Sequence, residues 1–125
     1  MSVRTVAAKF QELVSQGKHF EFMRTMYSPD MVSVEGDGRA TVGKEQVIHK
    51  SEVFQGANQF HSQDLRGPFF LGDASADSGR FGVYIALEFS PNSGGDRRRH
   101  EEVGLYTVQD GVVTREEFFY NGTLT

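Results

Sequence analysis

The spacing of apolar residues in the first half of the chain predicts three helices. In three stretches an apolar side chain recurs every three or four positions, which is the period of one helix face. Gly17 follows the first stretch and Gly56 the third, as glycine often does at helix ends, and the second stretch must end before Pro29. The third begins near Gly43. The three stripes are Val6, Ala7, Phe10, Leu13 and Val14; Phe20, Met23, Met26 and Tyr27; and Val47, Ile48 and Phe54.

Alternation of apolar and other residues dominates the second half and predicts strands. From Phe81 to Phe89 every second residue is apolar, which is the period of a strand with one buried face. The long segment from Gln59 to Leu71 is expected to bend at Gly67-Pro68. Gln109-Asp-Gly111 is typical of a tight hairpin. The expected strands cover residues 31–35, 59–71, 81–89, 100–108 and 112–120.

Helices followed by a run of strands indicate an α+β fold, in which the helices cover one face of an antiparallel meander. The chain contains no linker, internal repeat or low-complexity segment, so we expect one domain over residues 1–125. We expect its core to include Val6, Phe10, Leu13, Met23 and Val47.

Composition narrows the choice of function by exclusion. The formal charge of −4 argues against nucleic acid as a partner, and the one basic run, Arg97 to Arg99, is read as a solvated hairpin tip. The absence of cysteine excludes disulfides and a thiolate nucleophile. No stretch approaches the roughly 20 apolar residues of a membrane span, and the N-terminal residues lack a signal-peptide pattern, so we expect a cytoplasmic protein that does not bind membranes.

Three segments carry a family resemblance. Met26-Tyr-Ser-Pro-Asp-Met-Val-Ser-Val-Glu35 with Gly36-Asp-Gly38, then Gly43-Lys-Glu-Gln-Val47, and finally Tyr106 to Tyr120 resemble the nuclear transport factor 2-like superfamily, in its ketosteroid isomerase-like and polyketide cyclase (SnoaL-like) branch. The resemblance implies a cone: a strongly curved antiparallel sheet wraps the N-terminal helices, and its concave face opens as a central pocket.

The resemblance also implies roles for individual positions. Glu35 matches the general base of the steroid isomerases, and Tyr27 matches a tyrosine at the pocket floor. The two oxyanion donors of those enzymes do not carry over, because their positions match Phe10 and Gly104. Oxyanion donors supply several kcal/mol of transition-state stabilisation. Steroid isomerisation by the family route is therefore not expected.

The last hairpin offers further polar groups, since side chains on a strand alternate between two faces. A carboxylate beside an apolar wall loses hydration, which raises its pKa toward the range useful for acid–base chemistry. The alternative is a pair of ordinary glutamates at a solvated rim. By the family comparison, the face toward the pocket carries Glu102, Gly104, Tyr106, Val108, Thr114, Glu116, Phe118 and Tyr120.

Two candidate acid–base residues lie outside the hairpin. Glu35 either faces the pocket or ends its strand in solvent. His61 either faces the pocket as a near-neutral acid or base, or is an ordinary hydrogen-bonded strand residue. We expect catalytic roles for Glu35, Glu116 and His61, and ligand contacts from Tyr27, Phe10, Glu102, Tyr106, Phe118 and Tyr120.

No motif indicates a metal or cofactor. The four histidines show no metal-site spacing, and the chain contains no H-E-x-x-H, G-x-S-x-G, phosphate-binding loop or dinucleotide glycine pattern. We therefore expect neither a metal nor a cofactor.

Three functions remain open. The first is an isomerase, cyclase or lyase that uses carboxylate acid–base chemistry on a small apolar or cyclic substrate. The second is a non-catalytic binding protein for a hydrophobic metabolite, and the third is a protein-interaction domain that uses the outer sheet face. We also expect a homodimer through the convex face of the sheet, where Val103, Leu105, Val113 and Phe119 are placed by alternation.

Overall fold

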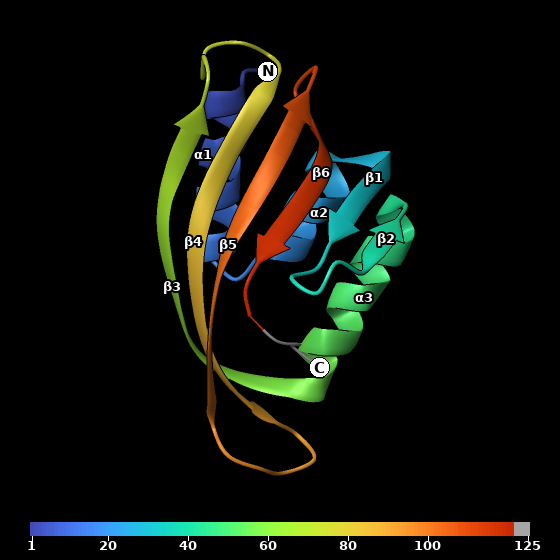
Figure 1. Cartoon of the computed structure of the whole chain (residues 1–125), viewed down its shortest axis with the longest axis vertical. Coiled ribbons are helices and arrows are strands. Elements are labelled where there is room, and N and C mark those ends of the chain that lie inside the picture. The colour runs from blue at the N-terminus through green and yellow to red at the C-terminus, as the bar shows by residue number, and fades with distance from the viewer. Residues whose placement is uncertain (122–125) are drawn as a thin grey trace.

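Three helices pack against one curved, six-stranded sheet in the computed structural model, which describes residues 1–121 (Figure 1). The expected domain, 1–125, extends beyond the described residues by its last four positions. The elements are α1 (Val3–Ser15), α2 (His19–Met26), β1 (Tyr27–Val34), β2 (Ala40–Val42), α3 (Lys44–Ala57), β3 (Asn58–Leu71), β4 (Gly79–Pro91), β5 (Arg98–Gln109) and β6 (Val112–Phe119).

The α+β architecture is confirmed, with two differences in the sheet. The strand order is β2-β1-β6-β5-β4-β3, so the short strand β2, which the sequence did not predict, forms one edge. The sheet is mixed rather than wholly antiparallel, because β1 pairs with β6 in parallel. Tyr27 follows α2 directly and lies opposite Val113, which follows the tight turn, so both strands start from the same end of the sheet.

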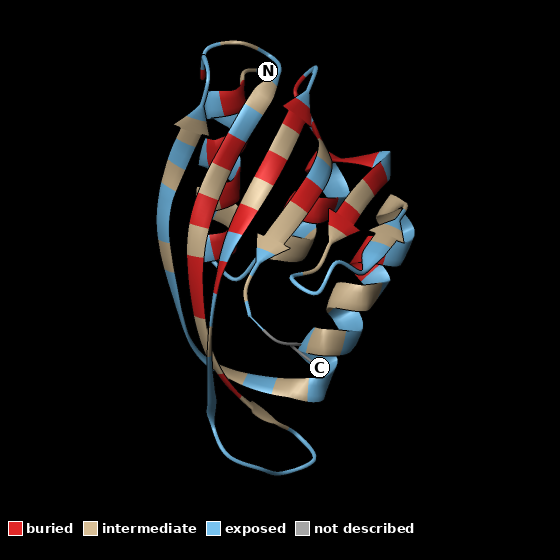
Figure 2. Cartoon of the chain, in the orientation of Figure 1, coloured by how far each residue is buried: buried red, intermediate tan, exposed pale blue. Residues whose placement is uncertain are grey.

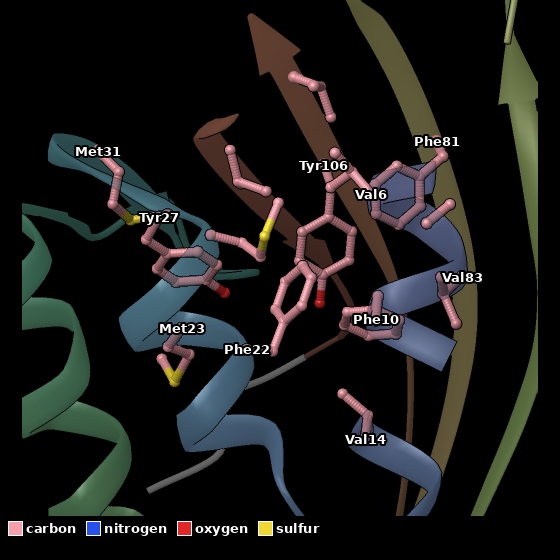
Figure 3. Packing of buried hydrophobic residues seen from close by; sticks show 14 of the residues in the cluster. Val6, Phe10, Val14, Phe22, Met23, Tyr27, Met31, Phe81, Val83 and Tyr106 are labelled. Carbon is pink, nitrogen blue, oxygen red and sulfur yellow. The ribbon is translucent and has the colours of Figure 1, made fainter. Parts of the chain in front are cut away.

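The core lies between the helices and the concave face of the sheet (Figure 2). Val6, Phe10, Met23 and Val47 are buried as predicted. Leu13 is only half-buried, because the inward position in the last turn of α1 belongs to Val14. Aromatic rings pack edge-to-face in the centre of the core. The centroids of the Phe10 and Phe22 rings are 5.2 Å apart, and the ring planes are inclined at 86° (Figure 3). Burying rings of this size supplies much of the apolar area on which the fold depends.

Three bulges interrupt the alternation of the long strands. One lies at the predicted bend, between Arg66 and Phe69, and another makes His61 an unpaired residue between Phe60 and Ser62. The third inserts Thr114 into β6, because Arg115 pairs with Thr107 while Val113 pairs with Val108. An extra residue reverses the faces of all residues beyond it. The bulges therefore decide which side chains reach the interior.

The bulge in β6 corrects one of the residues predicted for the outer face. Val113 is fully buried in the core, and Val112 takes the exposed position instead.

None of the helices within residues 1–121 has the length and apolar character needed to cross a bilayer.

The convex face of the sheet carries apolar side chains that the chain itself does not cover. Val103 and Phe119 lie opposite each other on β5 and β6, with exposed fractions of 44% and 53%. Phe69 and Leu71 on β3 add to this face, and the half-buried Leu105 lies between. A contiguous apolar surface of this kind usually marks an interface, and a two-fold dimer is the commonest closed arrangement.

We expect this face to pair two copies of the chain. Sedimentation at micromolar concentration should give a dimer, and Phe119→Glu should give a monomer, because a buried charge would face an apolar surface. Val53→Glu is the matched control, since Val53 is equally exposed but lies on α3. A wild-type protein that sediments only as a monomer would rule out the dimer.

Candidate active site

The polar residues of the interior are ordered by the register of the sheet. Ser33, Glu116, Tyr106 and Phe81 form one row across four adjacent strands. The next rows run through Phe118, Gly104 and Val83, then Glu102 and Ile85, then His100 and Leu87. The first row is buried throughout, whereas His100 and Leu87 in the last row are only half-buried. The rows therefore lead from the buried core to the half-buried end of the concave face, around His100 and Leu87, which is called the mouth.

Glu116 is the centre of the deepest polar cluster. It is 3% exposed, the Tyr27 hydroxyl donates to its Oε1, and the Ser33 hydroxyl donates to its Oε2 at 2.7 Å. Both donors come from β1, where Tyr27 and Ser33 are buried beside β6 on either side of an irregularity in the strand pairing. Each carboxyl oxygen thus has a partner in an otherwise apolar environment.

Burial changes the protonation of this cluster. Desolvation raises the pKa of Glu116 above its usual range, although hydrogen bonds from Tyr27 and Ser33 and the charge of Lys50 act in the opposite direction. Desolvation, followed by the charge of Glu116, raises the pKa of Tyr27 well above 10. The two groups together therefore hold protons more tightly than either would in water.

A second cluster continues from the first toward the mouth. Lys50 Nζ donates to Ser33 Oγ at 3.0 Å and to Glu35 Oε1, and the Tyr120 hydroxyl donates to Glu35 Oε2 at 2.8 Å. The Glu35 side chain is only 15% exposed, so it does not end in bulk solvent. Desolvation and the hydrogen bond to Glu35 raise the pKa of Tyr120 to about 12. An unbroken hydrogen-bonded chain therefore runs from Tyr27 to Tyr120.

Glycine at position 36 allows Tyr120 to reach Glu35. A Cβ atom at Gly36 would lie 2.9 Å from the Tyr120 ring and 2.8 Å from its backbone oxygen, closer than real side chains approach. The glycine-rich turn after β1 is thus a packing requirement of the site.

His100 and Glu102 form the polar edge of the mouth on β5. They are two residues apart, so both point to the concave face, and His100 Nε2 lies 3.0 Å from Glu102 Oε1. The His100 ring meets the Tyr120 ring edge-on at 4.8 Å. A carboxylate that orients an imidazole leaves the other ring nitrogen free for proton transfer.

The predicted pocket differs from the observed interior. Tyr27, expected to line a cavity, is buried in the core edge-on to Phe22 (Figure 3). Glu116, expected there too, is buried beside Tyr106 of the neighbouring strand. Two surface grooves of about 520 and 270 Å³ lie elsewhere, one beside α1 and β3 and the other beside α1 and α2. Neither groove is lined by the carboxylates and phenols of the concave face, so the predicted central pocket is not observed as a cavity.

Most of the candidate site residues come together, and one does not. Seven of them lie along the concave face: Glu35, Glu102, Glu116, Tyr27, Tyr106, Phe118 and Tyr120. Phe10 packs against the Tyr106 ring at 4.9 Å. His61 is exposed and contacts Ser90 at 2.8 Å, because the bulge takes it out of the alternation of β3. His61 is therefore not part of the cluster.

The sequence interpretation missed three residues of the site: Ser33, Lys50 and His100. Each had a signal. Lys50 follows the buried Val47 by three positions and so shares its helix face, and His100 precedes Glu102 by two positions on the same strand face. Within residues 1–121, no group of three His, Asp or Glu side chains is arranged to hold a metal ion.

Fold and site together define a class: cone-shaped α+β proteins whose curved sheet holds carboxylates and phenols on its concave face. The family described as the SnoaL-like domain matches residues 1–120. The chain therefore belongs to the SnoaL-like family, within the nuclear transport factor 2-like superfamily. No protein with a curated description matches it.

Solved structures show the same fold. A candidate SnoaL-like polyketide cyclase from Mesorhizobium loti is 31% identical, with 96% of this chain and 100% of that chain covered and a TM-score of 0.85. A candidate polyketide cyclase from Xanthomonas campestris is 12% identical over 95% and 90% of the two chains, with a TM-score of 0.72. A protein with a ketosteroid isomerase-like fold from Catenulispora acidiphila, solved in complex with trimethylamine, is 13% identical over 77% and 70% of the two chains, with a TM-score of 0.62. The last two similarities concern the fold alone.

The raised pKa of Glu116 predicts how stability depends on pH. A carboxyl that holds its proton more tightly when folded stabilises the fold below its unfolded pKa, and this contribution is lost as the pH rises above the ordinary value of 4.5. Urea unfolding at pH 5 and pH 8 should show a loss of stability that is smaller in Glu116→Gln, which does not titrate. Glu117→Gln, on the outer face, should behave as the wild type. Equal losses in Glu116→Gln and the wild type would contradict the assignment.

Proposed function

We propose that this protein is a proton-transfer enzyme, of isomerase, cyclase or lyase type, for a small apolar or cyclic substrate. The observation that carries the proposal is the hydrogen-bonded chain from buried Glu116 through Ser33 and Lys50 to half-buried Glu35. Membership of a family that includes candidate polyketide cyclases supports the same class of chemistry. Fold alone would not be sufficient support, because one fold hosts many functions.

Glu35 is the proposed base. Each carboxylate oxygen has two lone pairs, and the contacts with Lys50 and Tyr120 use one on each oxygen. A lone pair therefore remains to accept a proton from a carbon atom of the substrate. The Lys50 ammonium lies beside the carboxylate and offsets negative charge that develops in the substrate.

His100 takes the role of second proton carrier that the sequence interpretation gave to His61. Its Nε2 is held by Glu102, and its ring lies against Tyr120, whose hydroxyl contacts Glu35. An imidazole oriented in this way can accept a proton at a ring nitrogen and return it to the substrate. Tyr120 therefore contacts both the proposed base, Glu35, and the second proton carrier, His100.

One observation favours non-catalytic binding of a hydrophobic metabolite as the second candidate. By the family resemblance, Phe10 and Gly104 match the positions of the oxyanion donors of the steroid isomerases, and neither side chain can donate a hydrogen bond. Measurements of hydrogen exchange and of binding with one ketone, α-tetralone, distinguish catalysis from binding alone.

Replacing the base tests the proposal. α-Tetralone, a bicyclic aromatic ketone, exchanges the hydrogens next to its carbonyl for deuterium when a base removes them, and NMR in heavy water measures the rate. The wild type should accelerate this exchange. Glu35→Gln should lower the acceleration about 10²–10⁴-fold, as expected for lost acid–base catalysis, while α-tetralone still binds.

Glu52→Gln is the control, because Glu52 is an exposed glutamate of α3 that pairs with Arg24. An unchanged rate in Glu35→Gln would rule out Glu35 as the base. A wild-type rate equal to that of buffer, with the ketone bound, would favour the binding protein.

A further inference from the structure

The larger of the two grooves, about 520 Å³, lies between helix α1 and β3, the edge strand of the sheet (Figure 1). Its α1 wall carries Arg4, Ala8 and Glu12, which are four residues apart and therefore share one face of the helix. The half-buried Pro68 and Phe70 of β3 form the opposite wall. The groove has the volume of a ligand site and lies outside the proposed active site.

The α1 wall carries opposite charges that lack partners. Within residues 1–121, neither Arg4 nor Glu12 forms an ion pair. Asp73 interacts with the charge of Arg4, but its hydrogen bonds come from Ser75. The Arg4 guanidinium lies over the Phe70 ring, 5.1 Å from its centroid, which holds the cation at the groove. The groove therefore offers a cation at one end and a carboxylate at the other.

An amide group of the same wall is left unsatisfied. Gln11 lines the groove between the two charges, and its Oε1 is buried without a hydrogen-bond partner within residues 1–121. A buried acceptor without a donor is unfavourable. Rotation of this amide toward the groove would allow it to accept from an N–H group and donate to a C=O group of an occupant. A peptide backbone supplies both groups.

The spacing of the α1 residues matches that of an extended peptide. Arg4, Ala8 and Glu12 follow each other at intervals of about 6 Å, because a helix rises 1.5 Å per residue. Alternate residues of an extended chain lie about 6.6 Å apart and point to the same side. An acidic, an apolar and a basic residue at alternate positions therefore reach all three. The small side chain of Ala8 leaves room for the apolar residue against Pro68 and Phe70.

The edge of β3 does not itself suit an added strand. Pro68 has no backbone N–H, and the bulge between Arg66 and Phe69 interrupts the strand at the same place. Proline and bulges on an edge strand oppose pairing with another chain. The side chains of the groove, and not a continued sheet, therefore select the occupant. The same features argue against a second copy that pairs through this edge.

We propose that this groove binds an extended peptide segment of a partner protein, with an acidic, an apolar and a basic residue at alternate positions. The acidic residue pairs with Arg4, the apolar residue lies over Ala8, and the basic residue pairs with Glu12. The Gln11 amide turns toward the groove and bonds the peptide backbone. This site is independent of the proposed chemistry on the concave face.

A capped peptide, acetyl-Asp-Ser-Leu-Ser-Lys-amide, tests the proposal when it is titrated into the full chain and followed by NMR. The wild type should show saturable shifts at the amides of α1 and Phe70. Arg4→Glu should weaken binding about fivefold to tenfold, because an attraction becomes a repulsion. Lys9→Glu is the matched control: it makes the same change of charge on α1, but Lys9 lines the other groove. Its affinity should equal that of the wild type.

A second peptide gives the reciprocal test. Acetyl-Lys-Ser-Leu-Ser-Lys-amide should bind Arg4→Glu more tightly than it binds the wild type or Lys9→Glu. Ala8→Tyr fills the centre of the groove and should abolish the shifts with both peptides. Position 8 is exposed on α1, so this variant should fold, and its NMR spectrum without peptide shows whether it does.

Four results would overturn the proposal. They are the absence of saturable shifts in the wild type, shifts that lie on the concave face instead, equal losses in Arg4→Glu and Lys9→Glu, and full binding to folded Ala8→Tyr. Acetyl-leucine-amide that binds as tightly as the peptide would show that the groove takes a small apolar molecule. Shifts of the α1 amides that grow with protein concentration alone would assign the groove to a second copy. Either result would also overturn the peptide proposal.

Discussion

The buried carboxyl of Glu116 is the interaction on which the rest of the site depends. A carboxyl in an apolar interior is stable only if its oxygens are hydrogen-bonded, and here β1 supplies both donors through Tyr27 and Ser33. The parallel pairing of β1 with β6 meets this requirement, because it places Ser33 beside Glu116. The same pairing brings Lys50 of α3 within reach of Ser33 and Glu35. One desolvated group thus orders three elements that are far apart in the sequence.

The elements could be predicted from the sequence because helix and strand periods depend on residues close together in the chain. The alternation from Phe81 to Phe89 and the glycine after α1 were sufficient for their elements. The bulges at His61 and Thr114 could not be predicted, since they arise where a strand fits its curved neighbour. Val113 and His61 were assigned to the wrong faces for that reason. The parallel pairing of β1 is likewise a long-range choice that local pattern does not encode.

The candidate site was predicted in part. The carboxylates and phenols of the last hairpin follow from the family comparison and from alternation, and they do share one face. Lys50 was missed because a lysine on a helix is normally read as a solvated residue, whereas its partners Ser33 and Glu35 come from a separate strand and turn. His100 was missed because only the register of β5 places it beside Tyr120. Contacts between elements carry this information, and a single sequence does not display them.

The Tyr106 phenol lies over the backbone of Gly104, where a Cβ atom would be 3.2 Å from the hydroxyl oxygen, and this affects how members of this family are compared. Two residues along a strand span about 7 Å, which is close to the reach of a tyrosine side chain, so one strand position can place its oxygen above another. Matching residues by position finds a bare glycine at 104 and concludes that the polar group has been lost. Matching atoms in space finds an oxygen there, supplied from two residues further along. Conservation of an atom's location without conservation of its residue is thus a pattern to look for in the curved sheets of other SnoaL-like proteins.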